Sequence, residues 1–419
     1  MSSLLETLQT QARLAASTSG HIAEDLHAFF DIMSITAGHI DERVLAWVQT
    51  QNALINDATA AWQWLLENSD QVVAGYFISI PGAVGEPGVF DETTGTSGVI
   101  GTATTNLPDI GAGLTWSIVA GGDADISINS STGAVSSARA IYSGDSAVFT
   151  VQVTNGTLTI GFPFTATGTQ YSSEASALFA RITADPGTTR KNLINNLIVS
   201  LKTAGVWTKL DVLYLFAAAD SQSALLNWVS SSYNCTATNS PTFTANQGYT
   251  GNGTNAYLAT GFNPSSAAGR VFAQDSSHLG VYTLSTGTGV LNVLEAGSTT
   301  LSANWGINSF RSDLGNVIRA ELSGTAFSNS TAVASPKGHS AIARSSSSQV
   351  RIYRDGALLA TNSDTSATPT NTNLAWLRYN TTYSARQIAA GHMGGSLSDA
   401  EMSAMNTALS TYLTAVGAI

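Results

Sequence analysis

The first 71 residues carry a helical pattern of hydrophobic positions. From Leu5 to Leu65, apolar or small residues recur at alternating steps of three and four, with one extra step of four that ends at Val44. Such steps describe the heptad seam of a coiled coil, and the extra step is a stutter that locally unwinds a supercoil. The pattern therefore predicts a long helical segment that self-associates or docks onto a partner.

The apolar stripe of this segment is wider than the seam itself. A two-stranded coiled coil would leave many of its apolar residues in water, so we expect a homotrimer that is anchored to another protein. The alternative is one or two amphipathic helices within a single chain, divided at Gly20 or Gly38. The residues predicted to form the oligomer or docking interface lie on this stripe: Ile22, Leu26, Phe29, Met33, Ile40, Val44, Trp47, Leu54 and Leu65.

Residues 72–168 alternate apolar and polar positions with period two, which is typical of half-buried strands. Asn155-Gly156 separates two such runs and predicts a hairpin turn. About a hundred residues of short strands predict an immunoglobulin-like sandwich. The run INSSTGAVSS (128–137) resembles a turn of cadherin-like and bacterial immunoglobulin-like modules, which implies the same fold. Calcium is not expected, because acidic residues are sparse around Asp123 and Asp125.

Residues 169–229 return to a helical pattern and are interpreted as a helical lead-in to the last region. Apolar residues between Leu193 and Leu201 fall on one helical face, and Gly205 is expected to end that helix. The run VWTKLDVLYLFAAA (206–219) is apolar enough to be a core segment, either helix or strand.

Strand and turn patterns resume from residue 230 and continue to about residue 394. Asp355-Gly356 separates two strand-like runs and is expected to close a hairpin, because both residues tolerate positive φ. The segment 397–416 is amphipathic, and Ser398 and Glu401 have the spacing of a helix capping box. The whole chain is therefore predicted to be mainly β with a helical N-terminus.

Four stretches occur in an order that resembles the concanavalin A-like (laminin-G-like) jelly roll. They are YTGNGTNAYLATGFNP (249–264), GHSAIARSSSSQVRIYRDGALLA (338–360), LAWLRYN (374–380) and RQIAAGHMGGSLSDAEM (386–402). The preceding block (179–229) resembles the lead-in to such domains in phage and prophage tail or fibre proteins of proteobacteria. The resemblance covers residues 178–419 and implies a jelly roll over 230–419. It also implies a bacteriophage or prophage particle appendage, of fibre, spike or collar type, that attaches to a host-surface glycan.

Charge and composition exclude several functions. The chain has 17 Lys and Arg against 28 Asp and Glu, a net charge of −11, so nucleic acid is not an expected partner. A single cysteine, Cys235, and six histidines without metal-ligand spacing predict no metal and no cofactor. The polar, acidic start of the chain predicts neither a signal peptide nor membrane insertion, so we expect the chain to be made in a cytoplasm. Together with the resemblance to phage proteins, this implies a virion protein made in the host bacterial cytoplasm.

Catalytic residues are not predicted, and we expect the protein not to be an enzyme. Jelly-roll glucanases carry paired carboxylates on one strand, whereas Glu295, Glu321 and Glu401 are far apart in this sequence. A polysaccharide depolymerase on the same fold and a non-binding capsid or tail decoration protein are the alternatives. His278, His339 and His392 are interpreted as structural or surface residues. The aromatic residues predicted to bind a ligand are Trp305, Tyr249 and Tyr379.

Overall fold

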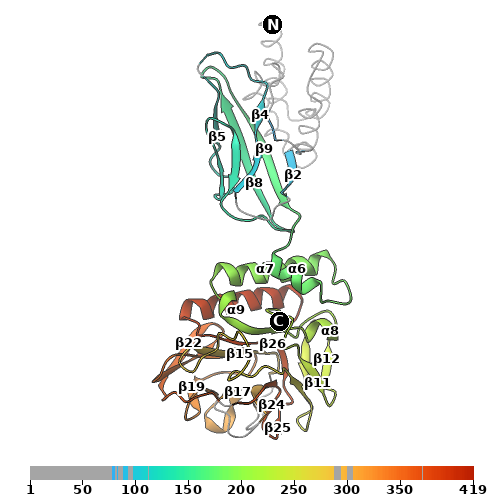
Figure 1. Cartoon of the computed structure of the whole chain (residues 1–419), viewed down its shortest axis with the longest axis vertical. Helices are drawn as coiled ribbons and strands as arrows, with labels where there is room; N and C mark the ends of the chain where they lie inside the picture. The colour runs from blue at the N-terminus through green and yellow to red at the C-terminus, as the bar shows by residue number, and fades with distance from the viewer. Residues whose placement is uncertain are drawn as a thin grey trace, which may run out of the picture. The chain divides into compact units, whose positions relative to one another are not determined.

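The computed structural model describes the chain from residue 78 onwards, with short gaps (Figure 1). The described ranges are 78–80, 83, 88–92, 98–111, 113–286, 294–299, 305–369 and 371–419. They belong to two compact units, one that ends at Tyr171 and one that spans Ser172–Ile419. The predicted coiled coil over 1–71, with all its interface residues from Ile22 to Leu65, lies outside the described residues.

The first unit contains a β-sandwich. Strand β8 alternates buried and more exposed positions along its length, as the period-two pattern predicts. One core cluster takes Phe149 and Phe164 from one sheet and Val135 from another. The four-stranded sheet has the order β2 (Gly88–Glu92), β9 (Thr159–Gly168), β8 (Ser146–Thr154) and β5 (Thr115–Ile118). The smaller sheets are β3 (Gly98–Thr102), β7 (Ala134–Ser137) and β6 (Ile126–Ile128), and the pair β1 (Ile78–Ser79) and β4 (Thr104–Thr105).

Two predicted turns in this unit are confirmed, and both use an asparagine side chain. Asn155 Oδ1 accepts hydrogen bonds from the backbone N–H groups of Thr157 and Leu158 at 3.1 and 2.9 Å, between β8 and β9. Asn129 Oδ1 accepts two backbone N–H groups in the same way, at 3.0 Å each, between β6 and β7. Each loop contains a glycine at positive φ, Gly156 and Gly133 respectively, a conformation that a residue with a Cβ rarely adopts.

The second unit is a larger sandwich of two antiparallel sheets, and it confirms the prediction of a mainly β chain. Its core cluster joins Val281 and Ile352 of one sheet to Trp305 and Trp376 of the other. The eight-stranded sheet has the order β12 (Thr242–Thr244), β13 (Gly248–Thr250), β26 (Gln387–Gly394), β15 (Ser277–Thr283), β20 (Gly338–Ser346), β21 (Gln349–Arg354) and β22 (Ala357–Ser363), with β10 (Leu210–Leu215) also paired to β26.

The seven-stranded sheet forms the other layer of this sandwich. Its order is β11 (Thr236–Thr238), β14 (Tyr257–Ala259), β23 (Leu374–Trp376), β16 (Ala296–Ser298), β17 (Trp305–Arg311), β18 (Val317–Leu322) and β19 (Ser328–Ala332). A short hairpin of β24 (Arg378–Tyr379) and β25 (Thr382–Tyr383) follows β23. The 3₁₀ turn η2 (Ser312–Leu314) connects β17 to β18.

Helices cover the outer side of the eight-stranded sheet. Figure 1 shows α7 (Thr188–Thr203) and α9 (Asp399–Ala415) side by side above it, with α6 (Ser173–Phe179) next to α7. The predicted capping box of Ser398 and Glu401 is confirmed at the start of α9. The open interpretation of 206–219 is settled in favour of a strand, since η1 (Trp207–Lys209) leads directly into β10. The segment interpreted as a helical lead-in therefore supplies one strand of the sheet, as well as α6, α7 and the short α8 (Ser221–Ala224).

The hairpin between β21 and β22 closes as predicted. Asp355 and Gly356 have φ values of 50° and 80°, the positive values that a two-residue turn of this type requires. Asp355 also ties the hairpin to the neighbouring strand, because its N–H donates to the His339 carbonyl and its Oδ1 accepts from the His339 N–H, each at 2.8 Å. Asp355 is therefore a turn residue of the fold.

Candidate functional site

The structure places the three predicted ligand-binding aromatics in different environments. Trp305 is fully buried in the sandwich core. Tyr249 is 3% exposed, and its hydroxyl donates to the carbonyl of Ser221 at 3.2 Å. Neither ring can stack on a ligand, so the prediction for these two residues is corrected: alternation along β17 and β13 turns both side chains inward. Tyr379 is half-buried at the surface and stays a candidate.

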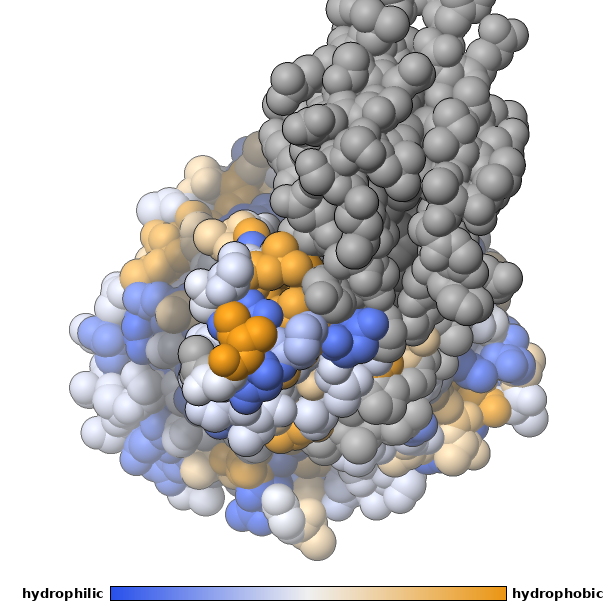
Figure 2. All heavy atoms as spheres, turned by 90° about the horizontal axis from the view of Figure 1, so that it is seen from above, coloured by the Kyte–Doolittle hydropathy of each residue, from blue (hydrophilic) through white to orange (hydrophobic). Residues whose placement is uncertain are grey.

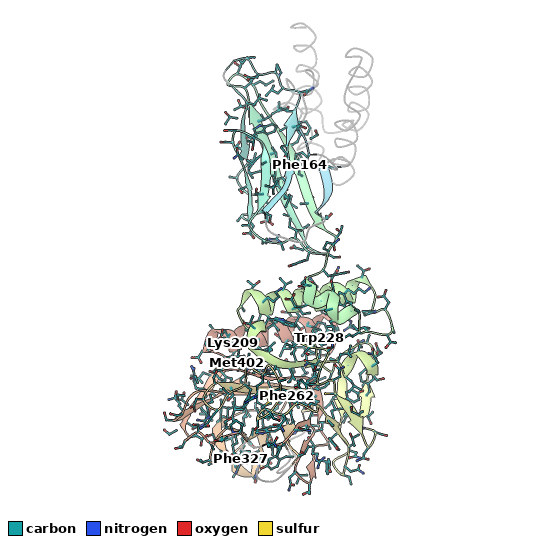
Figure 3. All side chains as sticks on the ribbon, in the orientation of Figure 1. Phe164, Lys209, Trp228, Phe262, Phe327 and Met402 are labelled. Carbon is teal, nitrogen blue, oxygen red and sulfur yellow. The ribbon has the colours of Figure 1, made fainter. Side chains whose placement is uncertain are left out.

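Tyr379 lies on the side of the seven-stranded sheet that faces away from the core. On β18, Ala320 and its neighbours two residues away belong to the core cluster, so Arg319 and Glu321 point to the opposite side. The same alternation on β14 turns Tyr257 outward, since Leu258 is in the core. Figure 3 places Phe327 on this side of the second unit, opposite Lys209 and Met402 near the helices.

Arginine side chains and aromatic rings pack against each other across this outer side. The Arg319 guanidinium lies 4.9 Å from the centroid of the Phe327 ring, which in turn meets Tyr379 edge to face at 6.1 Å. The Arg378 guanidinium lies near two rings, 4.6 Å from the centroid of Tyr257 and 5.6 Å from that of Tyr383. We call this set the arginine–aromatic face: Tyr257, Arg319, Glu321, Phe327, Arg378, Tyr379 and Tyr383.

Glycine in the sheet makes room for the central ring of this face. A Cβ on Gly297 of β16 would lie 2.8 Å from Cδ2 of Tyr379, closer than two carbon atoms approach. The Tyr379 ring therefore lies directly over the backbone of β16. Aromatic rings at a sheet surface, with planar polar groups beside them, offer apolar contact surfaces and hydrogen-bond donors to a ligand.

Glu321 is the carboxyl group of the arginine–aromatic face. Its side chain has no hydrogen bond or ion pair within the described residues, and the residue is 8% exposed. Burial raises the pKa of Glu321 to about 7, the charge of Asp364 raises it further, and Arg319 opposes both. At neutral pH this carboxyl group can therefore both donate and accept a hydrogen bond.

The other two glutamates considered for paired catalysis serve the fold. Glu295 is fully buried in an ion pair with Arg386, and its Oε2 accepts the N–H of Ser309 at 2.7 Å. Glu401 caps α9 and pairs with Lys209 at 2.6 Å. The structure thus leaves Glu321 alone, of these three glutamates, on the candidate ligand-binding face.

Three histidines converge on the other layer of the sandwich, a grouping that the sequence did not reveal. His278 of β15, His339 of β20 and His392 of β26 are fully buried on the side of the eight-stranded sheet that α9 covers. Nε2 of His339 and Nε2 of His392 share a hydrogen bond at 2.8 Å, and His278 Nδ1 lies 2.5 Å from the carbonyl of Gly395. Only the strand register, which places His392 opposite Gly280 and His339 opposite Tyr282, brings them together.

Burial keeps these histidines neutral. It lowers the pKa of His278 to about 4 and that of His339 to about 3, and it holds the pKa of His392 well below its ordinary value. They are structural residues, as the sequence interpretation proposed. Among the described residues, no group of three His, Cys, Asp or Glu side chains is arranged to hold a metal ion.

The acidic residues considered for calcium in the first unit surround an arginine. Arg139 lies among three carboxylates, with its Nη2 2.9 Å from Asp123 Oδ2 and its Nε 3.1 Å from Asp125 Oδ2, and it also pairs with Asp145. A guanidinium therefore already neutralises the acidic group. Burial works against the charged form of Asp123, but its hydrogen bonds and Arg139 prevail and lower its pKa.

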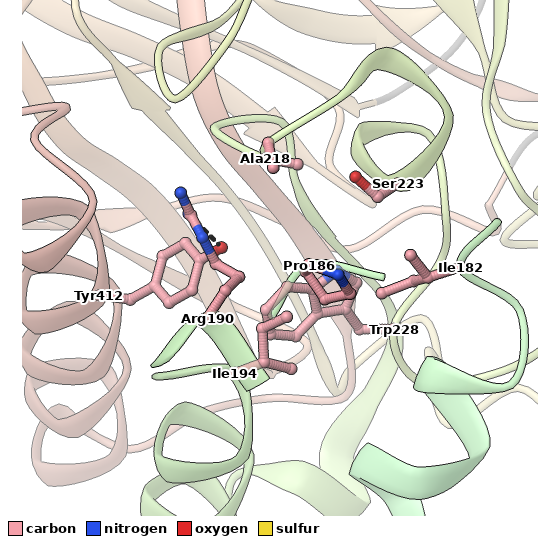
Figure 4. Close-up of a pocket in the computed structure, with 9 residues that line it drawn as sticks. Ile182, Pro186, Arg190, Ile194, Ala218, Ser223, Trp228 and Tyr412 are labelled. Carbon is pink, nitrogen blue, oxygen red and sulfur yellow. Dashed lines mark hydrogen bonds between the residues drawn. The ribbon is translucent and has the colours of Figure 1, made fainter. Parts of the chain in front are cut away.

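Hollows near the helices are less suited to a ligand. The pocket of Figure 4, between α7, α9 and the segment after β10, has a volume of about 10 Å³, room for roughly one water. Arg190 is among the residues that line it and donates to Tyr412 Oη at 3.1 Å. A shallow groove of about 430 Å³ between α7 and α9 is lined largely by small side chains such as Ser200 and Ala404.

Apolar groups do not gather into one continuous patch on the face that Figure 2 displays, where orange and blue spheres are interspersed. The large apolar side chains that are exposed in the described chain are scattered over both units: Val99, Ile110, Val148, Val271, Leu314, Leu358 and Ile419. No helix in the described ranges has the length and hydropathy of a membrane span.

No family model matches the chain, and no curated protein matches it. Domain 4 of a GH43 extracellular arabinanase from Geobacillus stearothermophilus, solved with arabinotriose, aligns with 47% of this chain and 98% of its own at 13% identity and a TM-score of 0.32. The botulinum neurotoxin serotype D binding domain aligns with 48% of this chain and 52% of its own, at 10% identity and a TM-score of 0.34. A Trypanosoma rangeli sialidase in complex with sialic acid aligns with 65% of this chain and 44% of its own, at 11% identity and a TM-score of 0.36. Similarities at this level transfer neither a ligand nor an activity.

Proposed function

We propose that the second unit is a saccharide-binding module and that the arginine–aromatic face is its binding surface. The observation that carries the proposal is the row of half-buried rings, Tyr257, Tyr379 and Phe327, laid beside two guanidinium groups on an outward sheet face. A sugar ring presents C–H groups on one side and hydroxyls at its rim. Aromatic faces and planar donors match those two kinds of surface.

A glycan array with the full-length chain tests this proposal. We expect binding to at least one oligosaccharide and a loss of about tenfold or more for Tyr379→Ala and Tyr257→Ala, because each removes a stacking surface. Phe243→Ala is the matched control, since Phe243 is a half-buried ring on β12 of the other sheet. Equal losses for Phe243→Ala and Tyr379→Ala would mean that the face is not the binding surface.

The wider setting that we propose is a bacteriophage or prophage-derived particle, with the protein as an appendage that contacts the host surface. The resemblance of residues 178–419 to phage tail and fibre proteins supports it, as does the order of a predicted helical segment, a sandwich and a second sandwich that resembles the concanavalin A-like jelly roll. Residues 1–71 would dock the protein onto another virion protein and form a homotrimer. Light scattering on the full-length chain and on a chain lacking residues 1–71 tests this: a trimer that becomes a monomer is the expected result.

A polysaccharide depolymerase is the second candidate, and the observation that favours it is Glu321. A carboxyl group with a pKa of about 7 on a ligand-binding face has the property of a general acid. We nevertheless prefer saccharide binding without hydrolysis, because hydrolysis needs a second carboxylate. The neighbouring carboxylate, Asp364, forms an ion pair with Arg344 and accepts the N–H of Thr325, so it is not free to act as a nucleophile. Release of reducing ends from host polysaccharide by the wild-type chain, abolished in Glu321→Gln, would favour the enzyme instead.

A further inference from the structure

Arg319 and Arg378 are the two arginines of the arginine–aromatic face, and neither has a carboxylate partner within the described residues. Within the described residues, neither forms an ion pair, and Arg319 has no hydrogen bond either. Five other arginines of the unit are neutralised by a carboxylate: Arg311–Asp313, Arg344–Asp364, Arg351–Asp399, Arg354–Asp355 and Arg386–Glu295. Arg181, Arg190 and Arg270 form no ion pair within the described residues, but each donates a guanidinium N–H to a carbonyl, amide or hydroxyl oxygen of the fold. The arginine–aromatic face therefore carries two cations without a carboxylate partner, although the chain as a whole has a net charge of −11.

Both guanidinium groups are held in place by aromatic rings. Arg319 lies over Phe327, and Arg378 lies beside Tyr257 and Tyr383 with its Nε donating to the carbonyl of Asn380 at 2.8 Å. Contact through the flat face leaves the N–H edges of a guanidinium available, and Arg378 keeps its two Nη groups for a ligand. A planar fork of N–H donors fits the two oxygens of a carboxylate better than a single hydroxyl.

The acidic groups nearest to these arginines do not cancel this positive charge. Asp364 is neutralised by its ion pair with the fully buried Arg344, and Asp313 by Arg311. Glu321 is the remaining carboxyl group of the face, and burial raises its pKa to about 7, so a large part of it is uncharged at neutral pH. An anionic ligand would thus meet two cations and little repulsion.

We infer that the arginine–aromatic face selects saccharides that bear carboxylate groups, with Arg319 and Arg378 donating to the acid and the adjacent rings stacking on the sugar. This inference rests on the proposed saccharide binding and adds the chemical class of the ligand. The carboxylate belongs to a uronic acid or a related acidic sugar, and the two arginines determine specificity.

The test uses the full-length chain and a panel of acidic oligosaccharides, each presented beside its carboxyl-reduced form. Reduction converts the carboxylate into a primary alcohol and leaves the sugar ring unchanged, so each pair isolates the charge. We expect the acidic member of a bound pair to bind more than tenfold tighter, and this preference to shrink as salt is raised. Arg319→Gln and Arg378→Gln should each remove most of the preference, whereas Arg→Lys at either site should retain part of it.

Lys337→Gln is the matched control, because it removes one exposed positive charge from the loop before β20, away from this face. Unchanged preference in Lys337→Gln supports the inference, and a loss equal to that of Arg319→Gln would show a general charge effect and overturn it. Equal binding of acidic and reduced members overturns the inference but leaves saccharide binding intact. Absence of binding to every member of the panel and of the glycan array overturns both. Thermal unfolding of each variant identifies any loss that comes from misfolding.

Discussion

The two outer sides of the second unit's sandwich both carry polar clusters, but with opposite properties. On the side of the eight-stranded sheet, α9 covers His278, His339 and His392, which are fully buried and neutral. On the side of the seven-stranded sheet, Arg319 and Arg378 are half-buried, charged and in contact with aromatic rings. The same strand alternation creates both clusters. Because α9 covers the histidines, they are part of the core of the fold. Within the described residues no helix covers the arginines, which is why we propose the second cluster as the ligand-binding face.

The largest expected effect is acid destabilisation of the side that α9 covers. The ordinary pKa of histidine is 6.5, and burial lowers it in the folded state for all three residues. The unfolded chain therefore binds protons below about pH 6.5 while the folded unit does not, so stability is fully present above that pH and falls as the pH drops. At pH 5 we expect a loss of about 2 kcal/mol per histidine.

Hydrogen exchange of the β15 and β26 amides at pH 7, 6 and 5, corrected for the intrinsic rate, measures this loss in the second unit alone. Carboxylates that are paired in the folded state, such as Asp313, have lowered pKa values because of their arginine or lysine partners. They cost stability only below their ordinary pKa of about 4. Glu321 has a folded pKa raised to about 7, so its protonation stabilises the folded unit between pH 7 and 5 and opposes the histidine effect; the Glu321→Gln background removes this contribution. Equal protection at pH 7 and pH 5 would contradict the neutral, buried state of the cluster.

A pair of glycine substitutions tests the difference between the covered histidine side and the arginine–aromatic face. A Cβ at Gly280 would lie 2.3 Å from Nε2 of His392, which is enclosed, whereas one at Gly297 would meet the half-exposed ring of Tyr379. We expect Gly280→Ala to lower the free energy of unfolding by about 3 kcal/mol, because the enclosed imidazole cannot move aside. Gly297→Ala should cost less than about 1 kcal/mol but weaken saccharide binding, because the Tyr379 ring shifts. Urea unfolding and glycan binding are measured on both variants. Similar destabilisation by Gly280→Ala and Gly297→Ala would contradict the expected difference between the two sides of the sandwich.

The hairpin residue Asp355 should affect stability without affecting binding. Asp355→Ala removes the acceptor of the 2.8 Å hydrogen bond from the His339 N–H and places alanine at a φ of 50°, which strains the backbone. We expect the free energy of unfolding to fall by about 1 kcal/mol. Asp355→Asn is the control, because asparagine tolerates positive φ and keeps an acceptor oxygen. Urea unfolding measures the cost, and a change in glycan affinity with unchanged stability would be evidence against a purely structural role.

The smallest expected effect is on the pH dependence of binding at the arginine–aromatic face. Glu321 faces Arg319 on β18, Tyr379 on β24 and the ion-paired Asp364 after β22, and burial raises its pKa to about 7. Lowering the pH from 8 to 6 protonates Glu321 and removes a negative charge, while a sugar carboxylate stays ionised. We expect affinity for an acidic saccharide to rise about threefold over this range. Calorimetric titration of Glu321→Gln should show no such rise; the same rise in that variant would assign it to another group.

Much of the fold could be predicted from local sequence because local interactions decide it. Asn155, Asn129 and Asp355 make their turns through their own side chains and through tolerance of positive φ, within a few residues. Ser398 and Glu401 cap α9 through each other. The segment 206–219 could not be assigned from pattern alone, since an apolar run fits a buried strand or helix equally; pairing of β10 with β26 decides it.

The candidate site was less predictable, because it depends on contacts between residues that are far apart in the sequence. Tyr379 lies at the surface, so its predicted role in ligand binding stays a prediction, whereas Trp305 and Tyr249 are core residues. A ring has the same appearance in sequence whichever side of a strand it occupies. Arg319, Glu321, Phe327 and Arg378 were missed, since no local motif joins them. Alternation along β18 indicates that Arg319 and Glu321 lie on the same side of the strand, but it does not indicate which side of the sheet packs against the core.

The sequence by itself determined that this chain is mainly β, where its turns lie and how its last helix begins, because those features depend on neighbouring residues and on periodicity. Only the tertiary structure decided which polar side chains meet and which meet solvent. Strand register gathers three histidines from distant strands, and α9 excludes water from them. Within the described residues no helix covers Arg319 and Arg378 on the opposite sheet face, and it is there that we propose an acidic saccharide binds.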